Sequence, residues 1–166
     1  MAGYTELLQT MLAMVIVSLL VINANRAIFV NNESLVEGEL ENQVIAIAQD
    51  FIEESRSTTF DATTVDGGVP VNIPEGFSSI GPGSGESTRA SFNDFDDYDG
   101  WMESITTANG VTYDVEVEVS YYEDGARTNS KSTLKQMIVT VSSDDLTNYG
   151  TNKSYSFKFL RSFYAD

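Results

Sequence analysis

The apolar N-terminal stretch constrains this chain more than any other feature of its sequence. From Leu7 to Ile22 only Gln9, Thr10 and Ser18 are polar, and a mainly apolar character continues to Val30. These 24 residues contain no proline. As a helix they would measure about 36 Å, compared with about 30 Å for the hydrocarbon core of a bilayer. Residues 1–30 are therefore predicted to form a helix that lies in a membrane or in the core of a filament.

A cleaved secretory signal peptide is the main alternative for this segment. Signal peptides have a basic N-terminal region and a small-residue cleavage site. The first six residues contain no Lys or Arg, although Ala24 and Ala27 could mimic a cleavage site. Several glutamates follow the span between residues 33 and 41, whereas cytoplasmic flanks are rich in Lys and Arg. We therefore expect a cytoplasmic N-terminus and an external C-terminal region, with Arg26 as the one opposing signal.

The segment 31–56 is predicted to continue the same helix in amphipathic form. Val36, Leu40, Val44, Ile47 and Phe51 follow one another at intervals of three or four residues, which places them on one helical face. The predicted helix runs without interruption from about residue 4 to residue 55. Its first half is apolar on all sides, and its second half has one apolar face to pack against another element.

Residues 57–100 are rich in Ser, Thr, Gly and Asp and contain all three prolines of the chain. This composition predicts an irregular loop with at most one short strand, near residues 69–73. Within it, residues 92–101 read FNDFDDYDGW. Asp94, Asp96, Asp97 and Asp99 could bind calcium, but their spacing does not fit an EF-hand loop. The two interpretations are a calcium site of another type and a solvated acidic turn.

Residues 101–166 alternate between apolar and polar side chains, which is typical of antiparallel strands with one buried face. Strands are predicted near residues 111–121, 134–143 and 154–164. Glu116 and Glu118 fall on the outer face of the first, so they are interpreted as solvated and not as a catalytic pair. Trp101 is expected to cap the core, with a ligand-stacking role as the alternative. The predicted fold class is α+β, with a long N-terminal helix packed on a C-terminal antiparallel meander.

Glu6 is a single acid at the start of the apolar run, in the sequence GYTELLQTMLAMVIV. If Met1 is removed, Glu6 becomes the fifth residue; starts at Met1 or Tyr4 are the alternatives. With this glutamate ahead of a long apolar helix, the chain resembles the type IV pilins and pseudopilins. The stretch 94–100 also resembles an acidic segment before the sheet of minor pilins. The resemblance implies that Glu6 of one subunit pairs with the N-terminal amine of its neighbour. A plain alternative is an acid at the membrane surface, stabilised by the helix dipole.

Composition excludes several functional classes. The chain has no Cys and no His, so disulfides, the usual zinc sites and Ser-His or Cys-His nucleophiles are impossible. Its net charge is −16, from 25 acidic and 9 basic residues, which leaves no basic face for nucleic acid. We expect neither an enzyme nor a bound cofactor, apart from the calcium considered above.

Together with the resemblance, these features predict a structural subunit of an extracellular type IV pilus-like filament, which the resemblance implies is inserted in the inner membrane before assembly. Its expected partners are identical subunits and a membrane-embedded assembly platform. The alternatives are a minor pilin or pseudopilin of a secretion or adhesion system, and a membrane-anchored binding domain that does not polymerise. Asn32 and Asn152 fit the N-glycosylation pattern. The predicted assembly residues are Ala2, Glu6, Leu7, Leu8, Met11, Leu12, Val15, Leu19 and Ile22.

Overall fold

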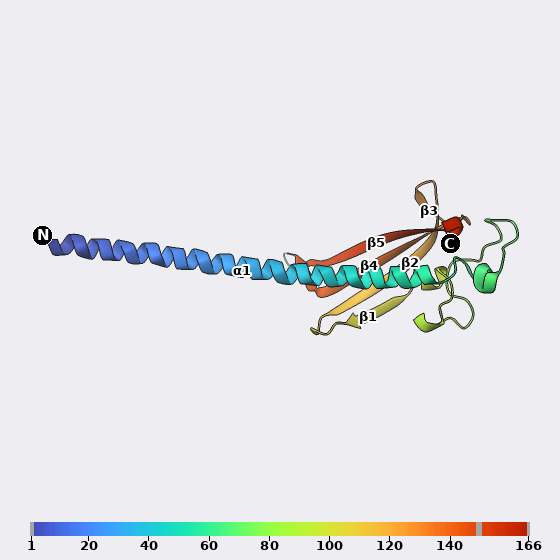
Figure 1. Ribbon diagram of the computed structural model, residues 1–166, viewed down its shortest axis with the longest axis horizontal. Coiled ribbons are helices and arrows are strands. Elements are labelled where there is room, and N and C mark those ends of the chain that lie inside the picture. Colours follow the sequence, from blue (N-terminus) through green and yellow to red (C-terminus); the bar gives the residue numbers. More distant parts are fainter. Residues whose placement is uncertain (1, 149–150, 166) are drawn as a thin grey trace. The chain divides into compact units, whose positions relative to one another are not determined.

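The structure, a computed structural model, describes residues 2–148 and 151–165 and has an α+β fold. It forms two compact units, residues 1–41 and residues 42–166, which are described separately. The elements are the helix α1 (Ala2–Ser57) and the strands β1 (Met102–Thr106), β2 (Thr112–Glu123), β3 (Ala126–Thr128), β4 (Leu134–Asn148) and β5 (Thr151–Ser162) (Figure 1). Short 3-10 helices cover Ala62–Gly67, Arg89–Ser91, Asp96–Tyr98 and Phe163–Ala165.

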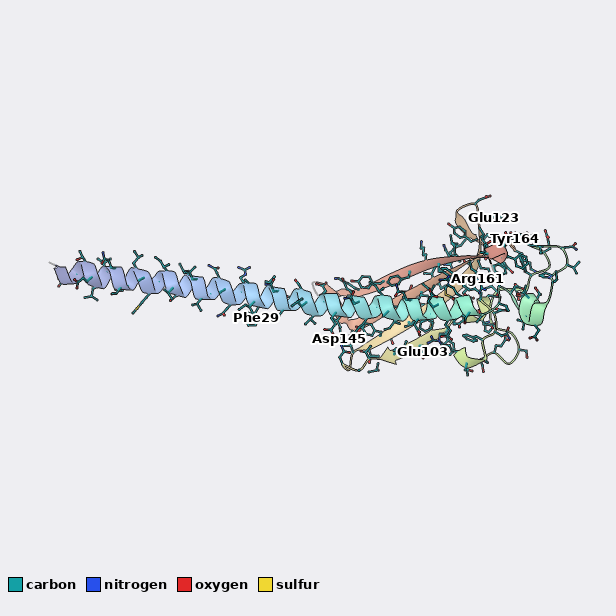
Figure 2. All side chains as sticks on the ribbon, in the orientation of Figure 1. Phe29, Glu103, Glu123, Asp145, Arg161 and Tyr164 are labelled. Carbon is teal, nitrogen blue, oxygen red and sulfur yellow. The ribbon has the colours of Figure 1, made fainter. Side chains whose placement is uncertain are left out.

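The first unit is the N-terminal part of α1. Its side chains project on all sides of the ribbon, as Figure 2 shows, with Phe29 74% exposed. Two hydroxyl groups in the apolar run donate to the helix's own backbone: Thr10 to the carbonyl of Leu7 at 2.9 Å, and Ser18 to that of Met14 at 2.8 Å. These polar groups therefore need no partner from water.

In the second unit, the C-terminal part of α1 packs on one face of the sheet. Val44, Ala48, Phe51 and Ser55 are all fully buried and recur every three or four residues, as one helical face requires. The hydroxyl of Tyr113 in β2 donates to the side-chain carbonyl of Gln43 at 2.9 Å. The predicted amphipathic face is confirmed for these helical turns.

The sheet is antiparallel throughout, in the order β1-β2-β4-β5, and β3 forms a hairpin with the end of β2. Alternate residues of β2 and β4 point into the core: Tyr113, Val115, Val117, Val119, Tyr121, Met137, Val139 and Val141 are buried. Glu116 and Glu118 are exposed between them. The predicted meander and its solvated acidic face are confirmed.

Two details of the predicted secondary structure are wrong. No strand forms at residues 69–73; Asn72 adopts a left-handed conformation (φ 62°), and its carbonyl accepts from the amide of Gly76 at 2.7 Å, which closes a turn. Pro70 precedes this turn and Pro74 lies within it, and both lack the amide donors that a strand ladder needs. Strands β1 and β3 were not predicted, because edge strands of five and three residues give little alternation to detect.

The segment between α1 and β1 is ordered by its own aromatic core. Phe60, Phe77 and Tyr121 are buried together, and Phe163 packs against them. The ring centroids of Phe60 and Phe77 are 5.2 Å apart, and both rings lie within 5.6 Å of Phe163. The irregular loop is thus fastened to the sheet by buried aromatic contacts.

Candidate functional site: an exposed apolar helix and a buried lysine–aspartate cluster

The predicted assembly residues lie on the exposed N-terminal part of α1. Seven of them have large apolar side chains, which are between 55% and 69% exposed: Leu7, Leu8, Met11, Leu12, Val15, Leu19 and Ile22. They are not confined to one face, because the neighbouring Met14, Ile16 and Leu20 are at least 50% exposed as well. The side chain of Ala2 lies outside the described residues. Such a sheath of apolar side chains is unstable in water unless lipid or other protein covers it.

Charge is almost absent from this part of the helix. Among the described residues before Asn32, only Glu6 and Arg26 are charged, and they lie between five and six helical turns apart. Glu6 has no ion pair with any described residue. By length and composition α1 is long and apolar enough to cross a membrane, and none of its most apolar window is buried within the chain.

Asn32 is exposed on α1, whereas the side chain of Asn152 lies outside the described residues, so both glycosylation sites stay predictions.

The second feature is a cluster of charged side chains in the core of the second unit. Lys135 of β4 is 0% exposed, and its ammonium donates to Asp61 Oδ2 at 2.8 Å, to the backbone carbonyl of Phe60 at 2.9 Å, and to Asp96 Oδ1. Asp61 and Asp96 are themselves no more than 1% exposed. A buried ion pair costs desolvation free energy, so it persists only where all of its hydrogen bonds are made.

Asp61 follows α1 and caps the 3-10 helix Ala62–Gly67. Its carboxylate accepts hydrogen bonds from the amide and hydroxyl of Thr63 at 3.1 and 2.7 Å, and from the amide and hydroxyl of Ser78 at 3.0 Å each. Burial alone would raise the pKa of Asp61, but the Lys135 ammonium and these donors outweigh it and lower that pKa to about 2. Asp61 is therefore ionised at neutral pH.

The acidic stretch, residues 92–101, contains three buried carboxyl groups, those of Asp94, Asp96 and Asp97. Asp94 Oδ1 accepts from the amides of Asp96 and Asp97 at 2.9 and 3.2 Å. Asp97 Oδ2 accepts from the amides of Asn93 and Asp94 at 2.7 and 3.1 Å. Burial, together with the neighbouring Asp96 and Asp97, raises the pKa of Asp94 to about 8, and burial raises the pKa of Asp96 against the opposing attraction of Lys135.

The interpretation of this stretch as a solvated acidic turn is wrong, because Asp94, Asp96 and Asp97 are each 1% exposed. Asp99 points elsewhere and accepts from the amide of Val119 at 2.7 Å. The carboxylates are directed at amides and at Lys135, and the described residues contain no group of three His, Cys, Asp or Glu side chains placed to hold a metal ion. The predicted calcium site therefore has no ligand set in the described part of the chain.

Two basic residues of the core, Lys135 and Arg161, were not predicted. Lys135 faces Asp61 and Asp96, and Arg161 of β5, 6% exposed, donates to the carbonyls of Ser55 at 2.8 Å and Thr58 at 2.7 Å at the end of α1. A signal was present in the alternation. Lys135 has the same parity as the buried Met137 and Val139, so its strand pattern already directed a charge into the core.

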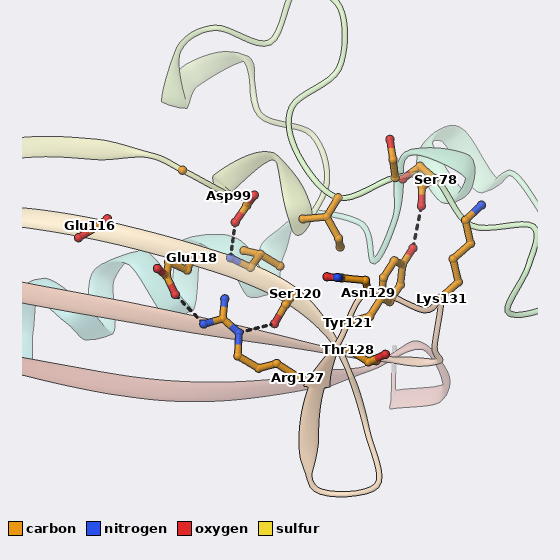
Figure 3. Close-up of a pocket in the computed structure, with 14 residues that line it drawn as sticks. Ser78, Asp99, Glu116, Glu118, Ser120, Tyr121, Arg127, Thr128, Asn129 and Lys131 are labelled. Atoms are coloured by element: carbon orange, nitrogen blue, oxygen red, sulfur yellow. Dashed lines mark hydrogen bonds and ion pairs between the residues drawn. The ribbon is translucent and has the colours of Figure 1, made fainter.

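A polar groove lies on the second unit beside this cluster. It has a volume of about 710 Å³, and Figure 3 shows the residues that line it. Two of its charged residues pair with each other: Arg127 contacts Glu118 Oε2 at 2.7 Å, and it also donates to the hydroxyl of Ser120 at 3.0 Å. The hydroxyl of Tyr121 donates to the carbonyl of Ser78 at 2.8 Å.

Trp101 does not line the groove. It is half-buried, and its ring packs edge-on against that of Phe92, with the ring centroids 5.3 Å apart.

The chain was compared with protein-family models, with curated proteins and with solved structures. None of the three comparisons found a match.

Proposed function

We propose that this chain is a structural subunit of an extracellular type IV pilus-like filament, which polymerises by packing its N-terminal helix against copies of itself. The observation that supports this most is the apolar surface of α1, exposed on every side over residues 7–30. Burying a single large apolar side chain contributes about 1.5–3 kcal/mol. Relative to water, covering the seven assembly residues therefore provides ample free energy, whether lipid or other subunits cover them.

Lipid could cover the same surface, so Glu6 distinguishes a membrane anchor from a filament subunit. A lone carboxylate in hydrocarbon costs a few kcal/mol. Pairing it with the N-terminal amine of an adjacent subunit, at 4 Å and an effective dielectric near 20, would recover about 4 kcal/mol. We therefore expect the free subunit to reside in the inner membrane. It would gain free energy when an assembly platform moves it from the membrane into the filament.

Paired variants of α1 test this role. Glu6→Gln keeps the size of the side chain but removes its charge, and Glu33→Gln makes the same change at an exposed acid beyond the apolar run. We expect Glu6→Gln to reduce the yield of sheared surface fibres at least tenfold at equal membrane levels of subunit, and Glu33→Gln to leave the yield unchanged. Wild-type fibre yield from Glu6→Gln would remove the role proposed for this carboxylate.

A minor pilin or pseudopilin is a variant of the same proposal, since it would use the same helix. The polar groove favours a second candidate, a membrane-anchored binding domain that never polymerises. Its volume of about 710 Å³ suits a polar ligand of moderate size. Fibres in surface material from cells would exclude this candidate for the bulk of the protein, and single detergent-bound molecules under all conditions would favour it.

A further inference from the structure

We infer that Lys135 and Asp96 condense into an intramolecular amide, an isopeptide bond that fastens the acidic stretch to β4. The inference does not depend on the proposed function. It starts from burial: the Lys135 ammonium, Asp61 and Asp96 are each no more than 1% exposed and lie within hydrogen-bonding contact. Burying separate ions costs free energy, and a neutral amide removes that cost.

The surroundings of Lys135 exclude water from the reacting groups. Its Nζ lies 4.6 Å from the ring centroid of Phe60 and 5.3 Å from that of Tyr121. In bulk water, amide formation from an amine and a carboxylic acid is opposed by ionisation and by the high concentration of water. In a dry site the fold holds the partners together, and effective molarities of about 10⁵–10⁸ M are known for well-oriented intramolecular reactions.

Two aspartates touch Lys135, and their hydrogen bonds indicate which one reacts. Asp61 accepts from two donors each of Thr63 and Ser78, so its carboxylate is well stabilised and a poor electrophile. Among the described residues, the contacts of Asp96 besides Lys135 are fewer: a long hydrogen bond from the hydroxyl of Ser78, at 3.4 Å, and one shared with Asp94. Because the pKa of Asp94 is raised to about 8, Asp94 holds a proton at neutral pH and can donate it to Asp96.

The atoms of the reaction balance without any external reagent. Lys135 Nζ gives one proton to the contacting Oδ1 of Asp96 and attacks its Cγ; Asp94 protonates the departing oxygen and is restored by the second proton from Nζ. The new N–C bond replaces one C–O bond, and one water leaves. The two protons in excess on the ammonium end up on that water, so Asp94 returns to its starting state. No electron is transferred, and the net charge of the chain stays the same.

The bond would serve a chain that has no cysteine. It would close a covalent loop between residues 96 and 135, the role that a disulfide has in other surface proteins. In a filament under tension, the second unit would then resist unfolding between residues 96 and 135.

Mass spectrometry of the denatured full-length protein tests the inference. The wild-type mass should lie about 18 Da, one water, below the sequence mass after any loss of Met1 is counted. After trypsin, residues 90–127 should appear joined to residues 132–153, with Lys135 uncleaved. Lys135→Arg, which keeps the positive charge but cannot form this amide, should show the full mass. Lys131→Arg, an exposed lysine in the preceding loop, is the matched control and should keep the deficit.

Three results would overturn the assignment. The first is a wild-type protein at its full sequence mass. The second is a water loss that persists in Lys135→Arg, which would identify cyclisation at an Asp-Gly pair such as Asp66-Gly67 or Asp124-Gly125. The third is a branched peptide that joins residues 132–153 to residues 57–89, which would identify Asp61 as the partner.

Discussion

Lys135 Nζ lies 2.8 Å from Asp61 Oδ2, and neither side chain has any exposed surface. This contact connects the end of α1 with the centre of the sheet, across 74 residues of sequence. The pair is complete in hydrogen bonds, and no buried side-chain polar atom of the described residues lacks a partner. The cluster can therefore specify the position of the loop as well as stabilise it.

Acid should lower the stability of the second unit by protonating Asp61. Its pKa is lowered to about 2 in the fold, from an ordinary value of 3.8, so its contribution is present above pH 4 and is lost as pH falls through about 2. The difference corresponds to about 2 kcal/mol of unfolding free energy. Chemical denaturation followed at pH 5 and at pH 2.5 should show this loss in Lys135→Arg, which keeps a positive charge beside Asp61 and cannot condense with Asp96. Adding Asp61→Asn to Lys135→Arg should make the loss between the two pH values smaller; an equal loss would contradict the assignment.

Asp94 should give the opposite dependence at higher pH. Its pKa in the fold is raised to about 8, so it binds a proton in the folded chain where the unfolded chain has lost it, and stability should fall as pH rises from 4 to 8. Asp94→Asn, a neutral side chain of the same shape, should reduce this fall, whereas Glu116→Gln at an exposed site should not. Thermal melting of the three proteins at pH 5, 7 and 8.5 measures it. Parallel curves for wild type and Asp94→Asn would contradict the prediction.

Much of this fold could be predicted from periodicity. Val44 and Phe51 repeat at helical spacing, and Val115, Val117 and Val119 alternate as in a strand; both patterns report burial directly. The cluster could not be predicted in the same way. Asp61, Asp96 and Lys135 lie far apart in sequence, and a carboxylate looks the same whether it is solvated or buried with a partner.

Packing of α1 on the sheet should depend on Phe51, which is fully buried. Phe51→Ala leaves a cavity and should lower the free energy of unfolding by about 3–5 kcal/mol. Ile45, on another side of the same helix, is 41% exposed, so Ile45→Ala should cost at most about 1 kcal/mol. Urea titration of both variants in detergent makes the comparison. Equal losses would mean that the helix does not pack on this face.

Arg161 should stabilise the C-terminal end of α1, because its guanidinium donates to the carbonyls of Ser55, Thr58 and Thr59. Arg161→Met keeps much of the apolar stem but removes the donor of the Thr58 carbonyl, at a cost of about 1–3 kcal/mol. The carbonyls of Ser55 and Thr59 still accept from the hydroxyl of Thr58 and the amide of Phe95. Lys158→Met, at an exposed position of the same strand, is the control. Hydrogen exchange should show faster exchange at the amides of residues 52–58 in Arg161→Met only. Unchanged protection there would contradict a capping role.

The proposed role as a filament subunit depends on what covers the apolar N-terminal helix. The most direct measurement is electron microscopy of material sheared from cells that produce the full chain, and of the purified protein after detergent is removed. The account predicts fibres of uniform width that contain this chain. Single molecules or irregular aggregates in both preparations, with the protein retained in the membrane fraction, would contradict it.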